Sequence, residues 1–262
     1  MVMMKDLKIS IVQADLAWER VELNLTKFAN TLYSIDFNPH IVVLPEMFTT
    51  GFSMNAEKLA EPINGSTTQW MQKIAKEKGF AICGSIIIND KENFYNRFLF
   101  VTPEGKVYEY DKRHLFTFAG ENKKYTYGQS RLVFEYLGWR ILPQVCYDVR
   151  FPVWSRNRGD YDLMINVANF PAERRDIWTT LLKARAIENQ CYVAASNRVG
   201  TSGMDIYYTG DSVLLNALGE PVSEALPGQE KVITGTFNKA SLEKFRKDFP
   251  VLPDIDDFSL KL

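Results

Sequence analysis

Apolar runs of strand length alternate with segments of helical periodicity along most of the chain. The runs predict buried strands at residues 7–14, 41–44, 80–88, 163–167, 192–196 and 232–237. Apolar residues at helical spacing predict helices at residues 24–33, 66–78, 173–190 and 240–247. Ser66 is the expected N-cap of the second helix, and Gly79 is its expected terminator.

Three further pairs of short runs, each pair separated by a turn signal, predict β-hairpins. They occupy residues 93–101 with 106–110, 132–136 with 139–145, and 211–215 with 221–225. Because strands alternate with helices and hairpins interrupt them, the pattern predicts an α/β layered sandwich with mixed sheets. No linker, repeat or low-complexity segment divides the chain, so residues 1–262 are expected to form one domain with an irregular tail at 249–262.

The composition is that of an ordinary globular protein, with 46% hydrophobic and 24% charged residues and a net charge of −1. This charge gives no reason to expect binding to nucleic acid or to an anionic membrane. The sequence contains no apolar run long enough to span a bilayer and no signal-peptide pattern at residues 1–6. Three cysteines without framework spacing indicate free thiols and a cytoplasmic location. With two histidines and no zinc motif, no metal site is expected.

The stretch at residues 142–152 is the first candidate for chemistry, because Cys146 lies where an apolar strand meets a turn that ends at Pro152. A side chain at that position is held rigidly and can face a cleft, as a nucleophile requires. The alternative, that Cys146 is one more buried thiol, is about equally compatible with this stretch alone. Cys83 and Cys191 lie in apolar segments and are expected to be core residues.

Two other ionisable residues follow strands directly. Glu46 comes after residues 41–44 and Pro45, and Lys112 comes after residues 107–111. A desolvated glutamate has a raised pKa and can serve as a base near neutrality, and an ammonium group can balance a thiolate. An exposed loop carboxylate and a solvated hairpin end remain the alternative interpretations of these two residues.

Taken together, the three segments resemble a known family. Residues 45–48 (PEMF), 112–116 (KRHLF) and 145–152 (VCYDVRFP) are similar to the signature segments of the nitrilase, or carbon–nitrogen hydrolase, superfamily, in the same order. The resemblance extends from residue 7 to about residue 249. Segments at 45–52, 151–157, 184–190, 197–200 and 210–212 most resemble the ω-amidase branch, although other branches share parts of them.

The resemblance implies an α-β-β-α four-layer sandwich with two mixed sheets. It also implies that Cys146 is the nucleophile, Glu46 the general base and Lys112 the cation. Glu121 corresponds to the second glutamate of the family, with a solvated loop charge as the alternative. The Lys112 ammonium and the backbone N–H of Tyr147 would bind the oxyanion. No metal or organic cofactor is implied.

The ω-amidase resemblance implies a small-molecule substrate, an ω-amide of a dicarboxylate such as 2-oxoglutaramate. Arg174 or its neighbour Arg175 is the candidate partner of the substrate carboxylate, although both also fit the polar first turn of a helix. Four aromatic residues that flank the motif positions could line a narrow pocket or simply belong to the core: Phe48, Phe116, Phe118 and Phe170. We expect Arg150 to pair with an acidic neighbour and Asp148 to set the turn after Cys146.

Other functions remain open at this stage. Within the same superfamily the chain could be a carbamoylase or a nitrilase. Outside it, Cys146 could be a thiol redox sensor, or the chain could be a binding module without catalysis. Association into a homodimer or a higher homo-oligomer is expected from the resemblance.

Overall fold

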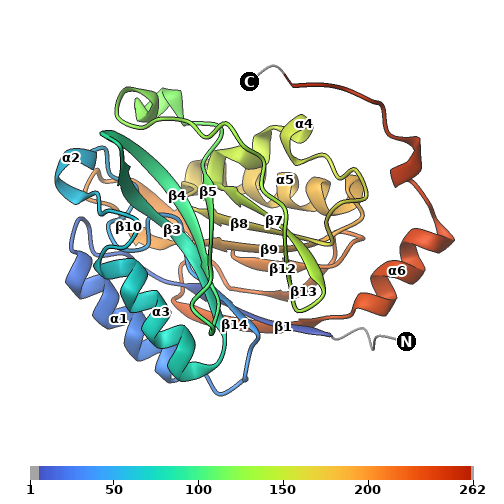
Figure 1. The fold of residues 1–262 in the computed structure, drawn as a ribbon, viewed down its shortest axis with the longest axis horizontal. Coiled ribbons are helices and arrows are strands. Elements are labelled where there is room, and N and C mark those ends of the chain that lie inside the picture. Colours follow the sequence, from blue (N-terminus) through green and yellow to red (C-terminus); the bar gives the residue numbers. More distant parts are fainter. Residues whose placement is uncertain (1–5, 261–262) are drawn as a thin grey trace.

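The computed structural model describes residues 6–260, in which two six-stranded sheets lie face to face (Figure 1). The strands of the first sheet are, in spatial order, β14 (Lys231–Phe237), β1 (Leu7–Gln13), β2 (Ile41–Val43), β3 (Ala81–Asp90), β4 (Asn93–Val101) and β5 (Val107–Asp111). Those of the second are β13 (Pro221–Glu224), β12 (Val213–Leu215), β9 (Tyr192–Asn197), β8 (Leu163–Ala168), β7 (Trp139–Val145) and β6 (Phe134–Tyr136).

Each sheet contains a parallel centre with antiparallel strands on both sides. Strands β1, β2 and β3 run parallel, while β14 and β4 pair antiparallel to that trio. The second sheet repeats the pattern, with β7, β8 and β9 parallel and β6 and β12 antiparallel. The predicted mixed sheets are therefore confirmed.

Helices cover the outer faces of both sheets. α1 (Val21–Tyr33) and α3 (Ser66–Lys78) lie on the first sheet, and α4 (Pro152–Ser155) and α5 (Arg175–Glu188) lie on the second (Figure 1). Two further helices are α2 (Ala56–Leu59) and α6 (Lys239–Asp248). The arrangement is the four-layer α-β-β-α sandwich that the resemblance implies.

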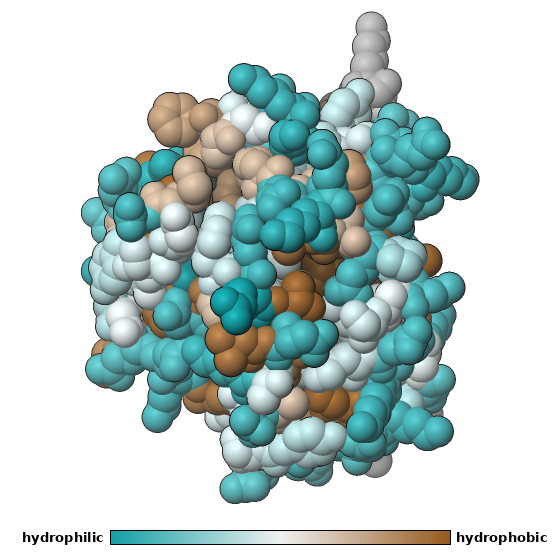
Figure 2. Space-filling model, turned by 90° about the vertical axis from the view of Figure 1, so that its left-hand side faces the viewer, coloured by the Kyte–Doolittle hydropathy of each residue, from teal (hydrophilic) through white to brown (hydrophobic). Residues whose placement is uncertain are grey.

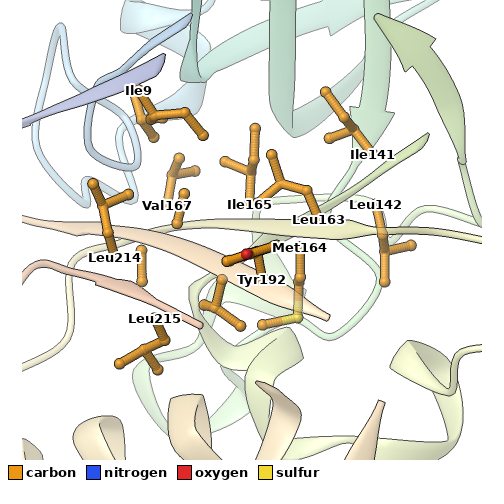
Figure 3. Packing of buried hydrophobic residues seen from close by; sticks show 14 of the residues in the cluster. Ile9, Ile141, Leu142, Leu163, Met164, Ile165, Val167, Tyr192, Leu214 and Leu215 are labelled. Atoms are coloured by element: carbon orange, nitrogen blue, oxygen red, sulfur yellow. The ribbon is translucent and has the colours of Figure 1, made fainter. Parts of the chain in front are cut away.

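Strand β8 shows why the central strands are continuous apolar runs. All six of its residues are buried, because one face meets the other sheet and the opposite face meets helices. Figure 3 shows Ile165 and Val167 pointing toward Ile9 of the first sheet, while Met164 points to the helical side. A run without polar alternation is what a strand buried on both faces requires.

Helix α3 agrees with its predicted bounds, but its first turn is capped differently from the prediction. Gly79 ends the helix in the left-handed conformation, with φ of +73°, as expected for a C-terminal glycine. Ser66 is the first helical residue rather than the cap. The Glu61 carboxylate accepts from the backbone N–H of Thr67 (2.8 Å) and from the Ser66 hydroxyl (3.0 Å), and so satisfies the helix start from outside.

Other boundaries differ by a few residues. Helix α1 begins three residues before the prediction, and α5 begins after a 3₁₀ turn at Ala172–Arg174. The sequence pattern did not reveal a small hairpin of β10 (Val199–Thr201) and β11 (Tyr207–Thr209). Residues 249–260 of the predicted tail are irregular except for a 3₁₀ turn at Leu252–Asp254, while residues 1–5 and 261–262 lie outside the described part.

None of the helices within residues 6–260 combines the length and the apolar character needed to cross a lipid bilayer.

The packing between the two sheets predicts where stability is concentrated. Replacing Ile165, which is fully buried, by alanine should lower the free energy of unfolding by about 2–5 kcal/mol, because it removes buried methyl groups and leaves a cavity. Ile177→Ala on the outer surface of α5 is the matched control and should change that free energy by no more than about 0.5 kcal/mol. Urea denaturation of both variants measures the difference, and equal midpoints would contradict this account of the core.

Candidate active site

Three of the sequence-predicted site residues and one further residue, an asparagine, follow the carboxyl ends of four strands. Glu46 follows β2, Lys112 follows β5, Cys146 follows β7, and Asn169 follows β8. In sheets with parallel centres, ligands bind outside the carboxyl ends of the strands, where loops from neighbouring strands meet. Because the two sheets are stacked face to face, side chains from both reach the same place.

Lys112 lies at the centre of a buried ionic cluster. Its ammonium Nζ is 2.9 Å from Glu46 Oε1 and 3.0 Å from both carboxylate oxygens of Glu121. The side chains of all three residues have no exposed surface. Asn96 on β4 donates from Nδ2 to Glu46 (2.7 Å) and to Glu121 (3.2 Å). The structure thus brings together Glu46, Lys112 and Glu121, and it rules out the solvated alternatives for each.

Asn169 connects this cluster to the second sheet. Its backbone N–H donates to Glu46 Oε2 (2.8 Å), and its side chain donates to the Glu46 carbonyl (2.6 Å). The Cys146 Sγ lies 3.8 Å from the Asn169 carbonyl oxygen. The thiol and the Glu46 carboxylate therefore contact the same residue, although they are far apart in the sequence.

The backbone at Cys146 adopts an unusual conformation that presents the sulfur. Its φ of +47° lies in the left-handed region, which non-glycine residues rarely occupy and which costs on the order of 1 kcal/mol. The Cys146 N–H donates to Asn166 Oδ1 (3.1 Å), and the Val145 N–H donates to Asp148 Oδ2 (3.0 Å). These hydrogen bonds hold the turn, in agreement with the expected role of Asp148.

Asp148 itself is anchored from the first sheet. It is fully buried and accepts from the Tyr110 hydroxyl (2.8 Å) and from the backbone N–H of His114 (2.9 Å). The His114 ring, stacked on Phe151, places Nδ1 2.8 Å from the same carboxylate. The cysteine turn is thereby fixed to the loop that follows Lys112.

Burial and charge shift the ionisation of the cluster. Burial raises the pKa of the Cys146 thiol well above its usual range, and the Glu46 carboxylate raises it further, whereas the Lys112 ammonium opposes both. Burial disfavours the charged form of Lys112, but the Glu121 and Glu46 carboxylates outweigh it and raise the lysine pKa. Burial, reinforced by the Glu46 charge, raises the pKa of Glu121 against the opposing effect of Lys112.

A cavity of about 510 Å³ opens onto the sulfur. Cys146 retains 9% exposure there, while the other two cysteines are fully buried. Besides Cys146 and Lys112, the wall includes five residues considered for the site from the sequence, namely Tyr147, Phe116, Phe118, Phe170 and Arg174. Further wall residues come from the segments 18–19, 52–55 and 204–208. Figure 2, seen from the side of α2 and β10, shows apolar side chains gathered in a hollow bordered by hydrophilic ones.

Phe48 does not line this cavity, so its predicted place at the substrate is wrong. Its ring lies 5.5 Å from the Phe28 ring on α1 and 6.0 Å from the Trp70 ring on α3. Gly84 on β3 leaves room for it, because a Cβ there would approach the Phe48 ring to 2.9 Å. Phe48 belongs to the core between the first sheet and its helices. This is the alternative that the sequence analysis left open for it.

The expectation that Arg150 pairs with an acidic neighbour is also wrong. Within residues 6–260 its side chain has neither an ion pair nor a hydrogen bond, and its guanidinium carbon lies 5.9 Å from the centre of the Tyr147 ring at the cavity wall. Arg175, the second candidate for the substrate carboxylate, lies outside the cavity and pairs with Asp211 at 2.8 Å.

Three asparagines of the site had been given no role from the sequence. Asn96 and Asn166 are fully buried polar residues within strands, and Asn169 follows the second of those strands. Asn166 is the one polar residue of an otherwise apolar strand, and that signal could have found it, because a buried amide requires a specific partner. The strand of Asn96 contains other polar residues and gives no such signal. Within residues 6–260 no group of three or more histidine, cysteine or acidic side chains is arranged to hold a metal ion.

Comparison with known families agrees with this geometry. The family model described as carbon-nitrogen hydrolase matches residues 8–247. The chain belongs to the carbon–nitrogen hydrolase family. It is therefore an enzyme of the class that hydrolyses carbon–nitrogen bonds, and the resemblance noted in the three sequence segments is confirmed.

Individual members of the family resemble the chain over nearly its full length. The omega-amidase YafV of Yersinia enterocolitica is 48% identical over 98% of this chain and 100% of its own. The 2-oxoglutaramate amidase of Bacillus subtilis is 33% identical over 94% of this chain and 96% of its own. A superfamily protein of Xanthomonas campestris, whose crystal structure carries an arsenic adduct in the active site, is 44% identical, with a TM-score of 0.96 over 98% of this chain and 100% of that one.

The raised pKa of Cys146 predicts a neutral thiol in the substrate-free enzyme at neutral pH. Because the pKa is raised, the thiolate should appear only as the pH rises above the ordinary range of a cysteine. The ultraviolet thiolate absorbance of the wild type, minus that of Cys146→Ser, measures this titration without contributions from Cys83 and Cys191. A complete thiolate signal at neutral pH would contradict the prediction.

Proposed function

We propose that this enzyme is an ω-amidase, which hydrolyses the ω-amide of a small dicarboxylate such as 2-oxoglutaramate to the acid and ammonia. The observation that carries the proposal is the buried Lys112, held between Glu46 and Glu121 at the cavity that exposes Cys146. The names of the Yersinia and Bacillus relatives supply the substrate class.

In the first half of the reaction Cys146 attacks the amide. Glu46 accepts the thiol proton as Sγ bonds to the carbonyl carbon, and the carbonyl oxygen becomes an oxyanion. The Lys112 ammonium and the backbone N–H of Tyr147 stabilise this oxyanion. Tyr147 lies in the first turn of the 3₁₀ helix Cys146–Arg150, where N–H groups have no partner within the helix.

The first half ends when the protonated Glu46 gives its proton to the leaving nitrogen, ammonia departs, and a thioester on Cys146 remains. In the second half the acyl group passes to water. The Glu46 carboxylate then takes a proton from water, whose oxygen attacks the thioester carbonyl. Collapse of that intermediate returns the proton to sulfur and releases the carboxylic acid.

Glu121 acts through Lys112 and is therefore a positioning residue. Its two oxygens both contact the Lys112 ammonium, and one also accepts from the Phe116 backbone N–H at 2.5 Å. A lysine fixed in this way needs no reorganisation when the oxyanion forms, which is how preorganised charges stabilise a transition state.

The substrate carboxylate is assigned to Arg174. Its guanidinium carbon lies 5.3 Å from the centre of the Phe116 ring at the cavity wall, and no acidic side chain of the described residues pairs with it. Phe116 and Phe170 form apolar parts of the same wall and contact the methylene chain of the substrate. A guanidinium binds a carboxylate through two parallel hydrogen bonds.

The competing functions receive less support. A carbamoylase or a nitrilase would use the same cluster, and ammonia release from 2-oxoglutaramate, compared with N-carbamoyl amino acids and nitriles, separates them. A redox sensor requires a thiol with a lowered pKa, whereas burial raises that of Cys146. A module without catalysis would not need a fully buried ionic cluster beside a strained cysteine.

We also propose that the chain acts in the cytoplasm as a homodimer or higher homo-oligomer. Three free cysteines fit a reducing compartment.

Glu46 and Lys112 follow strands of one sheet and Cys146 follows a strand of the other, so the activity requires the whole chain to act as one domain.

Removal of the proposed nucleophile or base should abolish most activity. Cys146→Ala should lower kcat for ammonia release from 2-oxoglutaramate by on the order of 10³-fold or more. Glu46→Gln should lower it by about 10²–10⁴-fold, because the amide cannot accept the thiol proton. Cys83→Ala, which deletes a thiol from the core, is the control and should retain activity. A Cys146→Ala protein with full activity would refute the mechanism.

Arg174 and Arg175 form a matched pair for testing the carboxylate assignment. Arg174→Gln should raise KM for 2-oxoglutaramate by about 10–100-fold, because a hydrogen bond between two charged groups is lost. Arg175→Gln removes the same charge from the neighbouring position, where the guanidinium pairs with Asp211, and should leave KM within about twofold. Steady-state kinetics of both variants decide the assignment, and equal effects on KM would contradict it.

A further inference from the structure

The cavity beside Cys146 is larger than the proposed substrate requires. Its volume is about 510 Å³. 2-Oxoglutaramate has about ten non-hydrogen atoms and occupies roughly 300 Å³, if each atom is given about 30 Å³, the share of one water molecule in the liquid. Space for a further group of several atoms therefore remains, and the wall residues determine which chemistry fits it.

The cavity wall has two ends that lie over different strands. Across the sandwich β1 contacts β9, whereas β4 contacts β7. Trp18 and Glu19 follow β1, and they share their end of the cavity with the β10–β11 hairpin, which follows β9. Phe116 and Tyr147 follow β5 and β7 at the opposite end, where Arg174 lies over the Phe116 ring. We call these two parts the Glu19 end and the Arg174 end.

Glu19 is the one acidic residue of the described cavity wall, and within residues 6–260 it has no cationic partner. Its half-buried carboxylate accepts hydrogen bonds from the Ser53 hydroxyl (2.5 Å) and from Asn55 Nδ2 (3.4 Å). These two neutral donors fix the position of the carboxylate but do not compensate its charge. A cation that enters the cavity therefore gains a charge-assisted hydrogen bond there.

Trp18 adds an aromatic face at the same end. Gly51 and Gly203 leave room for its indole, because a Cβ at these positions would lie 3.2 Å and 2.4 Å from the ring. The indole is thus enclosed by two segments and is held in one place. An ammonium group is attracted both to a carboxylate and to the face of an indole. Ile206 supplies apolar wall for an alkyl chain that carries such a group.

We propose that Trp18 and Glu19 form a subsite for a cationic leaving amine, so that the enzyme also hydrolyses N-substituted ω-amides whose amine carries a second ammonium group. The proposal rests on the proposed ω-amidase function. In that mechanism Glu46 protonates the leaving nitrogen, which therefore faces the loop after β2. Because β1 neighbours β2 and neighbouring strands lie about 5 Å apart, a short alkyl chain on this nitrogen reaches the Glu19 end.

The reaction on such an amide follows the same two halves. Cys146 Sγ bonds to the amide carbon, the carbon–nitrogen bond breaks, and the proton on Glu46 passes to the leaving nitrogen, so a diamine departs in place of ammonia. Water then hydrolyses the thioester, and one water is consumed for each acid and diamine formed. The acyl carboxylate lies at the Arg174 end and the second ammonium at the Glu19 end, so each substrate charge meets an opposite charge.

Pairs of N-substituted glutaramates test the subsite. In each pair one amide carries an aminoalkyl chain of two, four or six carbons, and the other carries an alkyl chain in which a methyl group replaces the ammonium. For the wild type, kcat/KM for the best aminoalkyl amide should exceed that for its uncharged partner by about 10–100-fold. The absence of such a preference at every chain length would overturn the proposal.

Variants at the Glu19 end locate the preference. Glu19→Gln should lower kcat/KM for the aminoalkyl amide by about 10–100-fold, and its effect on the uncharged partner and on glutaramate should be at least about tenfold smaller. Trp18→Leu keeps an apolar side chain but loses the aromatic face, so it should lower the preference for the charged amide by about 3–30-fold. Glu22→Gln, which removes the same charge from the exposed surface of α1, is the matched control. Equal losses on all three amides in Glu19→Gln would mean that Glu19 only supports the segment at residues 52–55, and would overturn the proposal.

A binding measurement without turnover separates this proposal from the proposed function. In the Cys146→Ala background, calorimetric titration with the three aminoalkyl glutaramates gives the affinity of each. The tightest of them should bind about 10–100-fold more weakly when Glu19 is replaced by Gln than when Glu22 is replaced by Gln. Equal affinities in these two variants would overturn the subsite. Binding that depends on Glu19, in a protein whose wild type hydrolyses no ω-amide, would refute the ω-amidase function alone.

Discussion

One ammonium between two carboxylates, all without exposed surface, is the interaction on which the site depends. Transfer of such charges out of water costs several kcal/mol for each ion, and only close pairing and complete hydrogen bonding offset that cost. Asn96, Asn169 and the Phe116 backbone supply those hydrogen bonds. Movement of the thiol proton from Cys146 to Glu46 leaves the net charge of this buried cluster unchanged. In the proposed mechanism the thiolate can therefore form without a change in the net charge of the buried cluster.

The same constraint explains why two sheets are stacked in this way. Glu46, Lys112 and Asn96 come from the first sheet, whereas Cys146, Asn166 and Asn169 come from the second. Asn169 bonds to Glu46 through both its backbone and its side chain, and Asp148 bonds to Tyr110 and His114 across the interface. Each sheet thus orients groups of the other. Only the complete sandwich, with its continuous apolar core, brings the reacting groups within contact.

Much of this arrangement was predictable from the sequence, and the reason lies in burial. Apolar runs that are buried on both faces, such as β8, reveal the parallel centres of the sheets, and a charged residue directly after such a run is conspicuous. Glu46 was found in this way, whereas Cys146 and Lys112 were singled out by their positions at the ends of other strands, and the family resemblance assigned the roles of all three. The hydrogen bond from the Cys146 backbone to Asn166 and the hydrogen bonds of Asn96 and Asn169 to Glu46 join residues that are twenty or more positions apart, so no local pattern encodes them.

The binding end of the cavity was less predictable because its residues are partly exposed. At the end of the cavity near Cys146 the charged side chains are fully buried, so each needs an oppositely charged partner, and few arrangements of the side chains meet that requirement. At the wall, Phe48 and Phe116 have the same side chain and both lie near motif positions, yet only Phe116 lines the cavity, because Gly84 makes room for Phe48 in the core. Arg150 and Arg175 are also the same residue type in different surroundings. The Arg175 guanidinium forms an ion pair with Asp211, whereas the Arg150 guanidinium lies near the Tyr147 ring. Which charged side chains the fold leaves unpaired depends on contacts between distant segments, so it cannot be read from a local sequence pattern.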